Sequence, residues 1–328
     1  MHEIIIGYLL SVKMKIKSFF SIVLFSVTAG FYSSCGDDSN EIINKDPEPE
    51  IIQQNPYLSR IEVPKLEKGN VFIQHSTKMG SDSVMTYCLE YNPKKYHSRW
   101  VAFRFDNLTR VNDKENVSRK DYFMDDPDLS SSQGIGYNGF GKKYVDAFGI
   151  TRECEGSAQF DRGHICASDD RKYSQDANDQ TFYMSNMSPQ LSNFNGIFWL
   201  AFEQKVQDLG RSASFADTLY VVKGGTITDD KTIGYISRTN GAHVTIPKYY
   251  YMALLAVKGS SYKSIGFYME HKEYGYKKAS EVTKDIMAGY AVSIDELEKV
   301  TGIDFFHNLP DAIENSVEAV FTASDWGL

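Results

Sequence analysis

The sequence predicts an α+β fold in which helices pack on a central antiparallel sheet. Short runs rich in Val, Tyr and Phe alternate with turn signals, which is typical of strands, at 85–92, 100–107, 218–226 and 249–257. Helical periodicity follows at 196–209 and 293–301. Because residues 57 to 328 contain no second linker and no internal repeat, we expect a single domain there.

The composition is that of a globular protein with an acidic balance. Hydrophobic residues make up 42% of the 328, and the formal net charge is −8. This negative net charge disfavours a protein that binds along nucleic acid through its overall charge. It is compatible with an enzyme that binds a few phosphates at a local site. The four cysteines, none of them in a CxxC pair, disfavour a structural zinc site; they are Cys35, Cys88, Cys154 and Cys166.

Residues 1–34 have the pattern of a lipoprotein signal peptide. Lys15 and Lys17 precede an apolar stretch, and Tyr-Ser-Ser-Cys resembles a lipobox that ends at Cys35. Residues 35–56 are acidic and carry three prolines, so we expect a disordered tether. These features predict an exported outer membrane lipoprotein, anchored through lipidated Cys35 and facing the periplasm or the cell surface. The alternative is an ordinary cleaved signal peptide in which Cys35 is incidental.

Two features of the domain stay open at the level of sequence. In an exported protein Cys154 and Cys166, the cysteines closest in sequence, form a disulfide or remain free buried thiols. The stretch 125–156 is rich in Gly, Ser and Asp, which predicts a long irregular loop with a functional role.

The chemistry is concentrated in residues 159–203. Residues 159–170 read QFDRGHICASDD, in which a carboxylate, a guanidinium, a glycine and an imidazole follow one another up to His164. Downstream, Asn186 begins an N-x-x-P-Q pattern, and a helix is expected to start near residue 192 or 193. Asn195 and Glu203 are eight residues apart, which places both on one ridge of that helix, where an amide oxygen and a carboxylate can share a hydrated metal.

This order of motifs resembles the DNA/RNA non-specific endonucleases of the ββα-metal superfamily. DRGH, N-x-x-P-Q, the Asn and the Glu occur in the family's order and at compatible spacing. The resemblance covers about residues 58 to 322 and extends to further segments at 99–107, 118–127, 246–255 and 296–310. It implies a ββα-metal nuclease core within the α+β domain at 57–328.

The resemblance also implies roles for individual residues. His164 would be the general base, and Asn195 the one direct protein ligand of Mg²⁺, with Mn²⁺ as an alternative. Glu203 would hold metal-bound waters, and Arg119 would contact the scissile phosphate with Arg162 close by. Asn186 would help position the site, and Asp161 would orient the motif. The implied reaction is hydrolysis of DNA and RNA to 5′-phosphate and 3′-hydroxyl ends, with no protein partner.

Competing interpretations follow from the same residues. The first is a related metal-dependent phosphodiesterase with another phosphate ester as substrate, and the second is a non-catalytic surface lipoprotein that binds nucleic acid. The remaining histidines of the domain are interpreted as structural, namely His75, His97, His243, His271 and His307. A local basic cluster is the expected source of substrate affinity, provided that its members converge in space: Arg119, Lys120, Lys142, Lys143, Arg162, Arg171 and Lys172.

Overall fold

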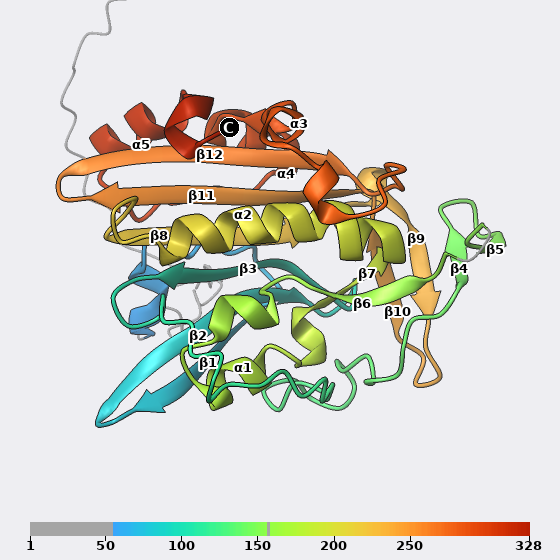
Figure 1. Cartoon of the computed structure of the whole chain (residues 1–328). Coiled ribbons are helices and arrows are strands. Elements are labelled where there is room, and N and C mark those ends of the chain that lie inside the picture. Colours follow the sequence, from blue (N-terminus) through green and yellow to red (C-terminus); the bar gives the residue numbers. More distant parts are fainter. Residues whose placement is uncertain (1–54, 156–157) are drawn as a thin grey trace, which may run out of the picture. The chain divides into compact units, whose positions relative to one another are not determined.

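A seven-stranded antiparallel sheet forms the centre of the domain (Figure 1). The structure, a computed structural model, describes residues 55–155 and 158–328, so the signal peptide and all but the last two residues of the tether lie outside the described residues. The strand order is β1-β2-β3-β8-β11-β12-β13. Their bounds are β1 Val71–Met79, β2 Asp82–Asn92, β3 His97–Phe105, β8 Thr218–Gly225, β11 Tyr249–Lys258, β12 Ser261–Glu270 and β13 Ala291–Val292. All four strands expected from the sequence are confirmed, in β2, β3, β8 and β11.

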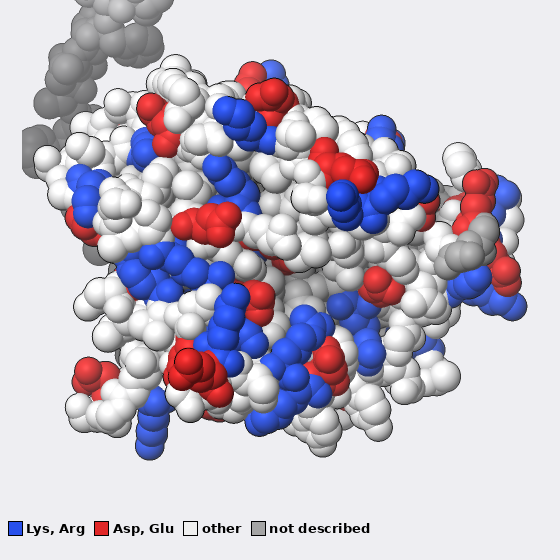
Figure 2. Space-filling model, in the orientation of Figure 1, with Lys and Arg blue, Asp and Glu red and all other residues white. Residues whose placement is uncertain are grey.

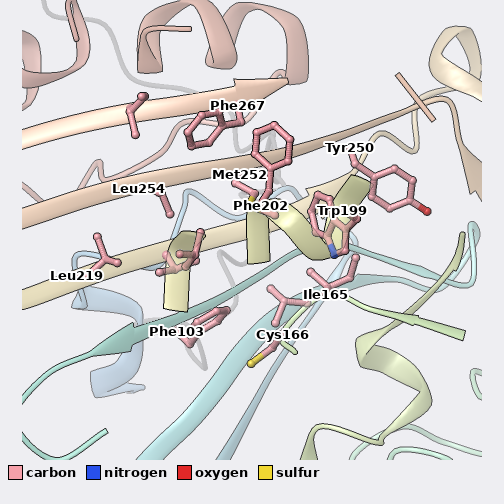
Figure 3. Packing of buried hydrophobic residues seen from close by; sticks show 14 of the residues in the cluster. Phe103, Ile165, Cys166, Trp199, Phe202, Leu219, Tyr250, Met252, Leu254 and Phe267 are labelled. Carbon is pink, nitrogen blue, oxygen red and sulfur yellow. The ribbon is translucent and has the colours of Figure 1, made fainter. Parts of the chain in front are cut away.

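Both faces of this sheet are buried, which explains the continuous apolar run in β11. Alternate side chains point to opposite faces of a strand. Met252 and Leu254 therefore join the core on one face, and Ala253 and Leu255 join the core on the other. Figure 3 shows the first core, in which Trp199 and Phe202 lie against residues of β8, β11 and β12.

Helices cover the sheet on both sides. The first core is closed by α2, Leu200–Arg211, and the second by α4, Ile294–Thr301, and α5, Asp311–Glu318. The predicted helix at 293–301 is confirmed: Ser293 caps α4 and exchanges hydrogen bonds with Glu296 in a capping box. The remaining short helices are α1 Gln175–Gln180, α3 Lys284–Ala288, η2 Pro56–Ser59, η3 Ser168–Arg171, η4 Met184–Asn186, η6 Asp229–Lys231, η7 Ala279–Glu281 and η8 Ala323–Trp326. No helix within 55–155 or 158–328 has the length and apolarity needed to cross a membrane.

The prediction of an irregular loop at 125–156 is wrong for its second half. Residues 125–142 contain no regular strand or helix, but β4, Lys143–Asp146, and β5, Thr151–Glu153, form a hairpin. Asp146 accepts hydrogen bonds from the backbone N–H groups of Phe148 and Ile150 and so shapes the turn. The hairpin joins β9, Thr232–Ser237, and β10, His243–Pro247, in a four-stranded sheet of order β10-β9-β4-β5.

A short hairpin followed by a helix carries the motif residues. β6, Phe160–His164, pairs antiparallel with β7, Met187–Leu191, and the helix that follows starts at residue 192 as expected. Its first turns are a π-helix, η5, Phe194–Trp199, which continues directly into α2. Because a π-helix bonds residue i to i+5, steps of four residues do not stay on one ridge there. The expected ridge is therefore only partly correct: Trp199 and Glu203 are neighbours, whereas Asn195 turns toward Asp161.

Candidate active site

Close packing of the β6–β7 hairpin requires the glycine of the DRGH motif. Gly163 pairs with Ser188 on β7, and the buried side chain of Gln190 lies across it. A Cβ at position 163 would be only 2.0 Å from Gln190 Oε1 and 2.7 Å from its Cγ. The hairpin thus fixes the position of His164, the last residue of β6, opposite Met187 of β7.

The His164 imidazole is buried and neutral. Its ring packs edge-on against Phe182, with ring centroids 4.9 Å apart, and lies 5.9 Å from the Phe123 ring. Burial, followed by the positive charges of Arg119 and Arg162, lowers the pKa of His164 to about 3. Its Nε2 atom has no hydrogen-bond partner among the described residues, so a neutral ring nitrogen remains able to accept a proton.

Each of the two arginines lies over one of these rings. The Arg162 guanidinium carbon is 3.6 Å from the centroid of Phe123, and Arg162 donates a hydrogen bond of 2.6 Å to the Tyr137 carbonyl. The Arg119 guanidinium is 5.2 Å from the centroid of Phe182, and its Nε donates to Asp121 over 2.7 Å. The structure therefore brings His164, Arg119 and Arg162 together around two aromatic rings.

Asn195 stands at the start of the helix with its amide oriented by Asp161. Asn195 Nδ2 donates to Asp161 Oδ2 over 3.3 Å, and the other Asp161 oxygen accepts from Ser192 Oγ over 3.0 Å. This use of the amide nitrogen leaves the Asn195 carbonyl oxygen outside that bond. An amide oxygen on a half-buried side chain is a donor that hard cations accept.

Glu203 lies deeper, one helical turn after Trp199. Trp199 Nε1 is 3.0 Å from Glu203 Oε1 and 3.3 Å from the His164 carbonyl, so the indole links the two proposed site residues. Burial raises the pKa of Glu203 to about 8, although the nearby Lys223 opposes the shift. Lys223 itself is held in a buried ion pair with Asp170 at 2.8 Å. The Glu203 carboxyl therefore has no ion pair of its own with Lys223, and a bound cation would provide the positive charge that stabilises its ionised form.

Asn186 is a positioning residue for the chain after His164. It is fully buried, and its Oδ1 accepts from the Cys166 N–H over 2.8 Å. Its Nδ2 donates to the Cys166 and Thr181 carbonyls, each over 2.8 Å. All these bonds go to backbone, so the Asn186 side chain fixes the strand end rather than facing the site.

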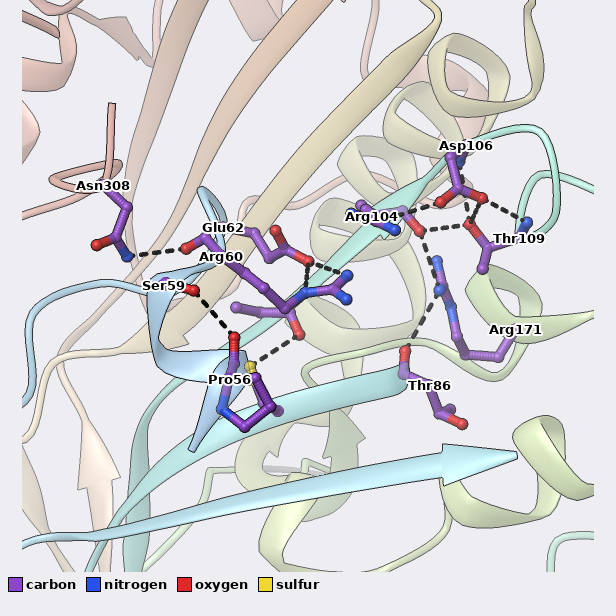
Figure 4. A network of polar contacts seen from close by, with 12 residues as sticks. Pro56, Ser59, Arg60, Glu62, Thr86, Arg104, Asp106, Thr109, Arg171 and Asn308 are labelled. Atoms are coloured by element: carbon purple, nitrogen blue, oxygen red, sulfur yellow. Dashed lines mark hydrogen bonds and ion pairs between the residues drawn. The ribbon is translucent and has the colours of Figure 1, made fainter. Parts of the chain in front are cut away.

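The expected basic cluster converges only in part, because two of its members are interior. Arg171 is fully buried against Phe103 and Phe105, and it donates to the Thr86 and Arg104 carbonyls (Figure 4). Lys172 is also buried. Figure 2 shows Lys and Arg side chains along the middle of one face, interrupted by acidic ones. The interior pair cannot reach phosphate, and the members of the expected cluster whose charges act on His164 are Arg119 and Arg162.

Among the other histidines, His97 and His271 have the contacts expected of structural residues. His97 and His271 are buried and bonded to backbone carbonyls, and burial lowers the pKa of each to about 4. The described cysteines are all free, which decides the open alternative against a Cys154–Cys166 disulfide.

Among the described residues, two groups of histidine or acidic side chains lie close enough together to hold a metal ion. One consists of His75, Asp126 and Asp128, and was not anticipated from the sequence because its members are about fifty residues apart. The His75 Nε2 to Asp126 Oδ2 distance is 2.9 Å, that of a hydrogen-bonded pair. The other consists of Asp295, Glu298 and Glu318.

Comparison with known proteins places this site in a family. Residues 68–312 match the family of DNA/RNA non-specific endonucleases, and the chain belongs to that family. Its hairpin and helix therefore form the ββα-metal core of a nuclease fold, as the sequence predicted.

The chain is similar to nucleases of bacteria, fungi and animals. A nuclease of Nostoc sp. is 28% identical, over 76% of this chain and 83% of its own. Nuclease C1 of Cunninghamella echinulata is also 28% identical, over 68% and 81%. A chain in the crystal structure of the EndoG/EndoGI complex shares the fold, with a TM-score of 0.52 and 20% identity over 73% of this chain and 88% of that one.

Proposed function

We propose that this protein is an exported, membrane-anchored endonuclease that hydrolyses phosphodiester bonds in both DNA and RNA. The observation that carries the proposal is the neutral, buried His164, whose Nε2 lacks a hydrogen-bond partner among the described residues. The His164 ring packs near two phenylalanine rings, each of which has an arginine guanidinium over it. Family membership supports the reaction class.

In the proposed reaction His164 Nε2 accepts a proton from water. The resulting hydroxide attacks phosphorus as the P–O bond to the 3′ oxygen breaks, and the departing 3′ oxygen takes a proton from solvent water, so the products carry 5′-phosphate and 3′-hydroxyl ends. His164 then returns its proton to solvent. Arg119 and Arg162 bind the phosphate, whose negative charge offsets theirs. The charges of Arg119 and Arg162 add to the effect of burial in lowering the pKa of His164. A bound phosphate offsets these charges, so the His164 pKa rises and the imidazole becomes a stronger base.

Asn195 and Glu203 are the residues proposed to hold Mg²⁺ or Mn²⁺. Asn195 offers its amide oxygen directly, while Glu203 binds waters of the ion's hydration shell. The bound ion would stabilise the charge that develops on the leaving oxygen. The carboxyl of Glu203 fits this role, because an adjacent cation favours its ionised form against the effect of burial.

The proposed location rests on residues outside the described part of the chain. Export through the signal peptide at 1–34 and lipidation of Cys35 would hold the domain on the outer membrane by the tether at 35–56. Metabolic labelling with a fatty acid tests this: label is expected on the protein and absent from Cys35→Ala. Unlabelled wild-type protein would refute the anchor but not the nuclease.

The activity is tested with the purified protein on supercoiled plasmid and on total RNA, each with Mg²⁺ and with EDTA. Both substrates are expected to be degraded only with Mg²⁺, and His164→Ala is expected to lose activity by orders of magnitude. His243→Ala is the matched control, since this exposed histidine stacks on Tyr235 in the other sheet. Full activity in EDTA, or in His164→Ala, would refute the mechanism. A folded protein that cuts neither substrate would refute the proposed function.

A further inference from the structure

Three carboxylates from α4 and α5 meet on the face of the sheet opposite α2. One oxygen from each of Asp295, Glu298 and Glu318 lies within 4.8 Å of the other two. Glu318, the last residue of α5, is only 4% exposed, and its Oε1 has no hydrogen-bond partner among the described residues. An ionised carboxylate in such a place is costly unless a positive charge accompanies it.

That positive charge does not come from a side chain in the described part of the domain. No ion pair within residues 55–155 and 158–328 joins a lysine or arginine to any of the three carboxylates. Glu314 adds further negative charge nearby, and the charge of Asp304 is offset in part by Lys65, whose Nζ is 3.5 Å from Asp304 Oδ2. Burial, reinforced by these neighbours, raises the pKa of Glu318 to about 9 and that of Glu298 to about 7.

Packing, rather than attraction, brings the carboxylates together. Leu297 of α4 and Val317 of α5 belong to the same core, so both helices are held on the sheet whatever their charges do. Glu298 is also fixed from one side, because its Oε1 accepts the Phe305 N–H over 2.7 Å. Glu298 and Glu318 consequently have little room to separate, while Asp295 approaches them from the exposed side.

The spacing matches a shared oxygen-ligated ion. Two oxygens that are each 2.3–2.6 Å from a common Ca²⁺ lie at most about 4.6–5.2 Å apart. Ca²⁺ also accepts irregular sets of six to eight oxygens that include water and backbone carbonyls, whereas Mg²⁺ demands a tighter octahedron. The half-open arrangement, with Asp295 exposed and Glu318 buried, leaves room for such waters.

We propose that Asp295, Glu298 and Glu318 bind a divalent cation of the calcium class that ties α4 to α5. This site is separate from the proposed nuclease centre, because α2 and the helix start at Asn195 lie over the other face of the sheet. Its function is stability of the helical layer, and it does not depend on the nuclease activity.

The test measures thermal unfolding of the purified protein after EDTA treatment and dialysis, with and without Ca²⁺. At tenfold excess over the dissociation constant, one bound ion raises the folded-to-unfolded ratio about elevenfold, which shifts the midpoint by roughly 3–6 °C. Asp295→Asn is compared with Asp285→Asn, because each aspartate is the second residue of a helix whose Ser or Thr N-cap is hydrogen-bonded. Glu318→Gln removes the buried charge without changing shape.

Wild type and Asp285→Asn are expected to gain stability from Ca²⁺, while Asp295→Asn and Glu318→Gln gain little. In EDTA at pH 7, Glu318→Gln is expected to be more stable than wild type, because wild-type Glu318 is ionised in the unfolded chain and must take up a proton on folding. Equilibrium dialysis should find one more Ca²⁺ on wild type than on Glu318→Gln, which separates this site from binding at His75 or Asn195. The proposal is overturned if Ca²⁺ leaves the wild-type midpoint unchanged or shifts all four proteins equally. If Glu318→Gln does not fold, the aspartate pair still decides.

Discussion

Replacement of Gly163 by alanine tests whether the hairpin packing positions the catalytic strand. The added Cβ would lie 2.0 Å from Gln190 Oε1, 2.4 Å from its Cδ and 2.7 Å from its Cγ. All three distances are shorter than a carbon contact allows, and the Gln190 side chain is fully buried. Relief therefore requires either Gln190 to leave its packed position or β6 and β7 to separate.

The size of the effect follows from the behaviour of overpacked interiors. Overpacking costs about 1–3 kcal/mol, which lowers the unfolding midpoint by roughly 2–12 °C for a domain of this size. Because His164 follows directly, we also expect nuclease activity to fall by at least tenfold at a temperature where the variant is folded.

The assay is urea unfolding followed by tryptophan fluorescence, together with plasmid cleavage. Gly139→Ala is the matched control, since a Cβ there meets no atom within 4 Å. Gly163→Ala with wild-type stability and wild-type activity would refute the reasoning. Loss of activity without loss of stability would mean that the glycine acts on substrate rather than on the hairpin.

Three further predictions concern the same site. Asn186→Ala leaves buried backbone groups unpaired, so the free energy of unfolding should fall by about 2–4 kcal/mol in urea titration, against little change for the exposed Asn116→Ala. The folded pKa of His164 lies below its unfolded value, so its contribution to stability is present above pH 6.5 and is lost as the pH falls from 6.5 toward 3. The free energy of unfolding should thus decline less steeply over this window in His164→Asn than in wild type, and an equal slope would contradict the burial argument. The folded pKa of Glu203 is raised to about 8, so Glu203→Gln should unfold at higher temperature than wild type at pH 9 while its Mg²⁺-dependent cleavage is reduced; lower stability at pH 9 would be the opposite result.

Local patterns predicted the elements and the residues within the motif. The apolar run of β11 and the Ser293–Glu296 capping box act over a few residues, so they are readable without knowledge of distant partners. The DRGH and Asn motifs are equally local, and the structure brings His164 and Arg162 together simply because they are two residues apart on one strand.

Interactions between distant segments were not readable in this way. The β4–β5 hairpin is short, and it pairs with β9, which lies about ninety residues later. Arg171 has the appearance of a phosphate ligand in sequence, yet it is interior because Phe103 and Phe105 of β3 provide aromatic faces for its guanidinium. The π-helix at the start of α2 likewise breaks the ridge that ideal helical spacing predicts.

The sequence by itself therefore determined the α+β class, the nuclease motif and the family resemblance, because each depends on residue type at short spacing. Only the tertiary structure decided which charged groups face the site and which are buried. The tertiary structure also decided that the carboxylates of Asp295 and Glu318, which come from separate helices, lie within 4.8 Å of each other. The physical reason is that the free energy of a charge depends on its surroundings, and those surroundings are assembled from segments far apart along the chain.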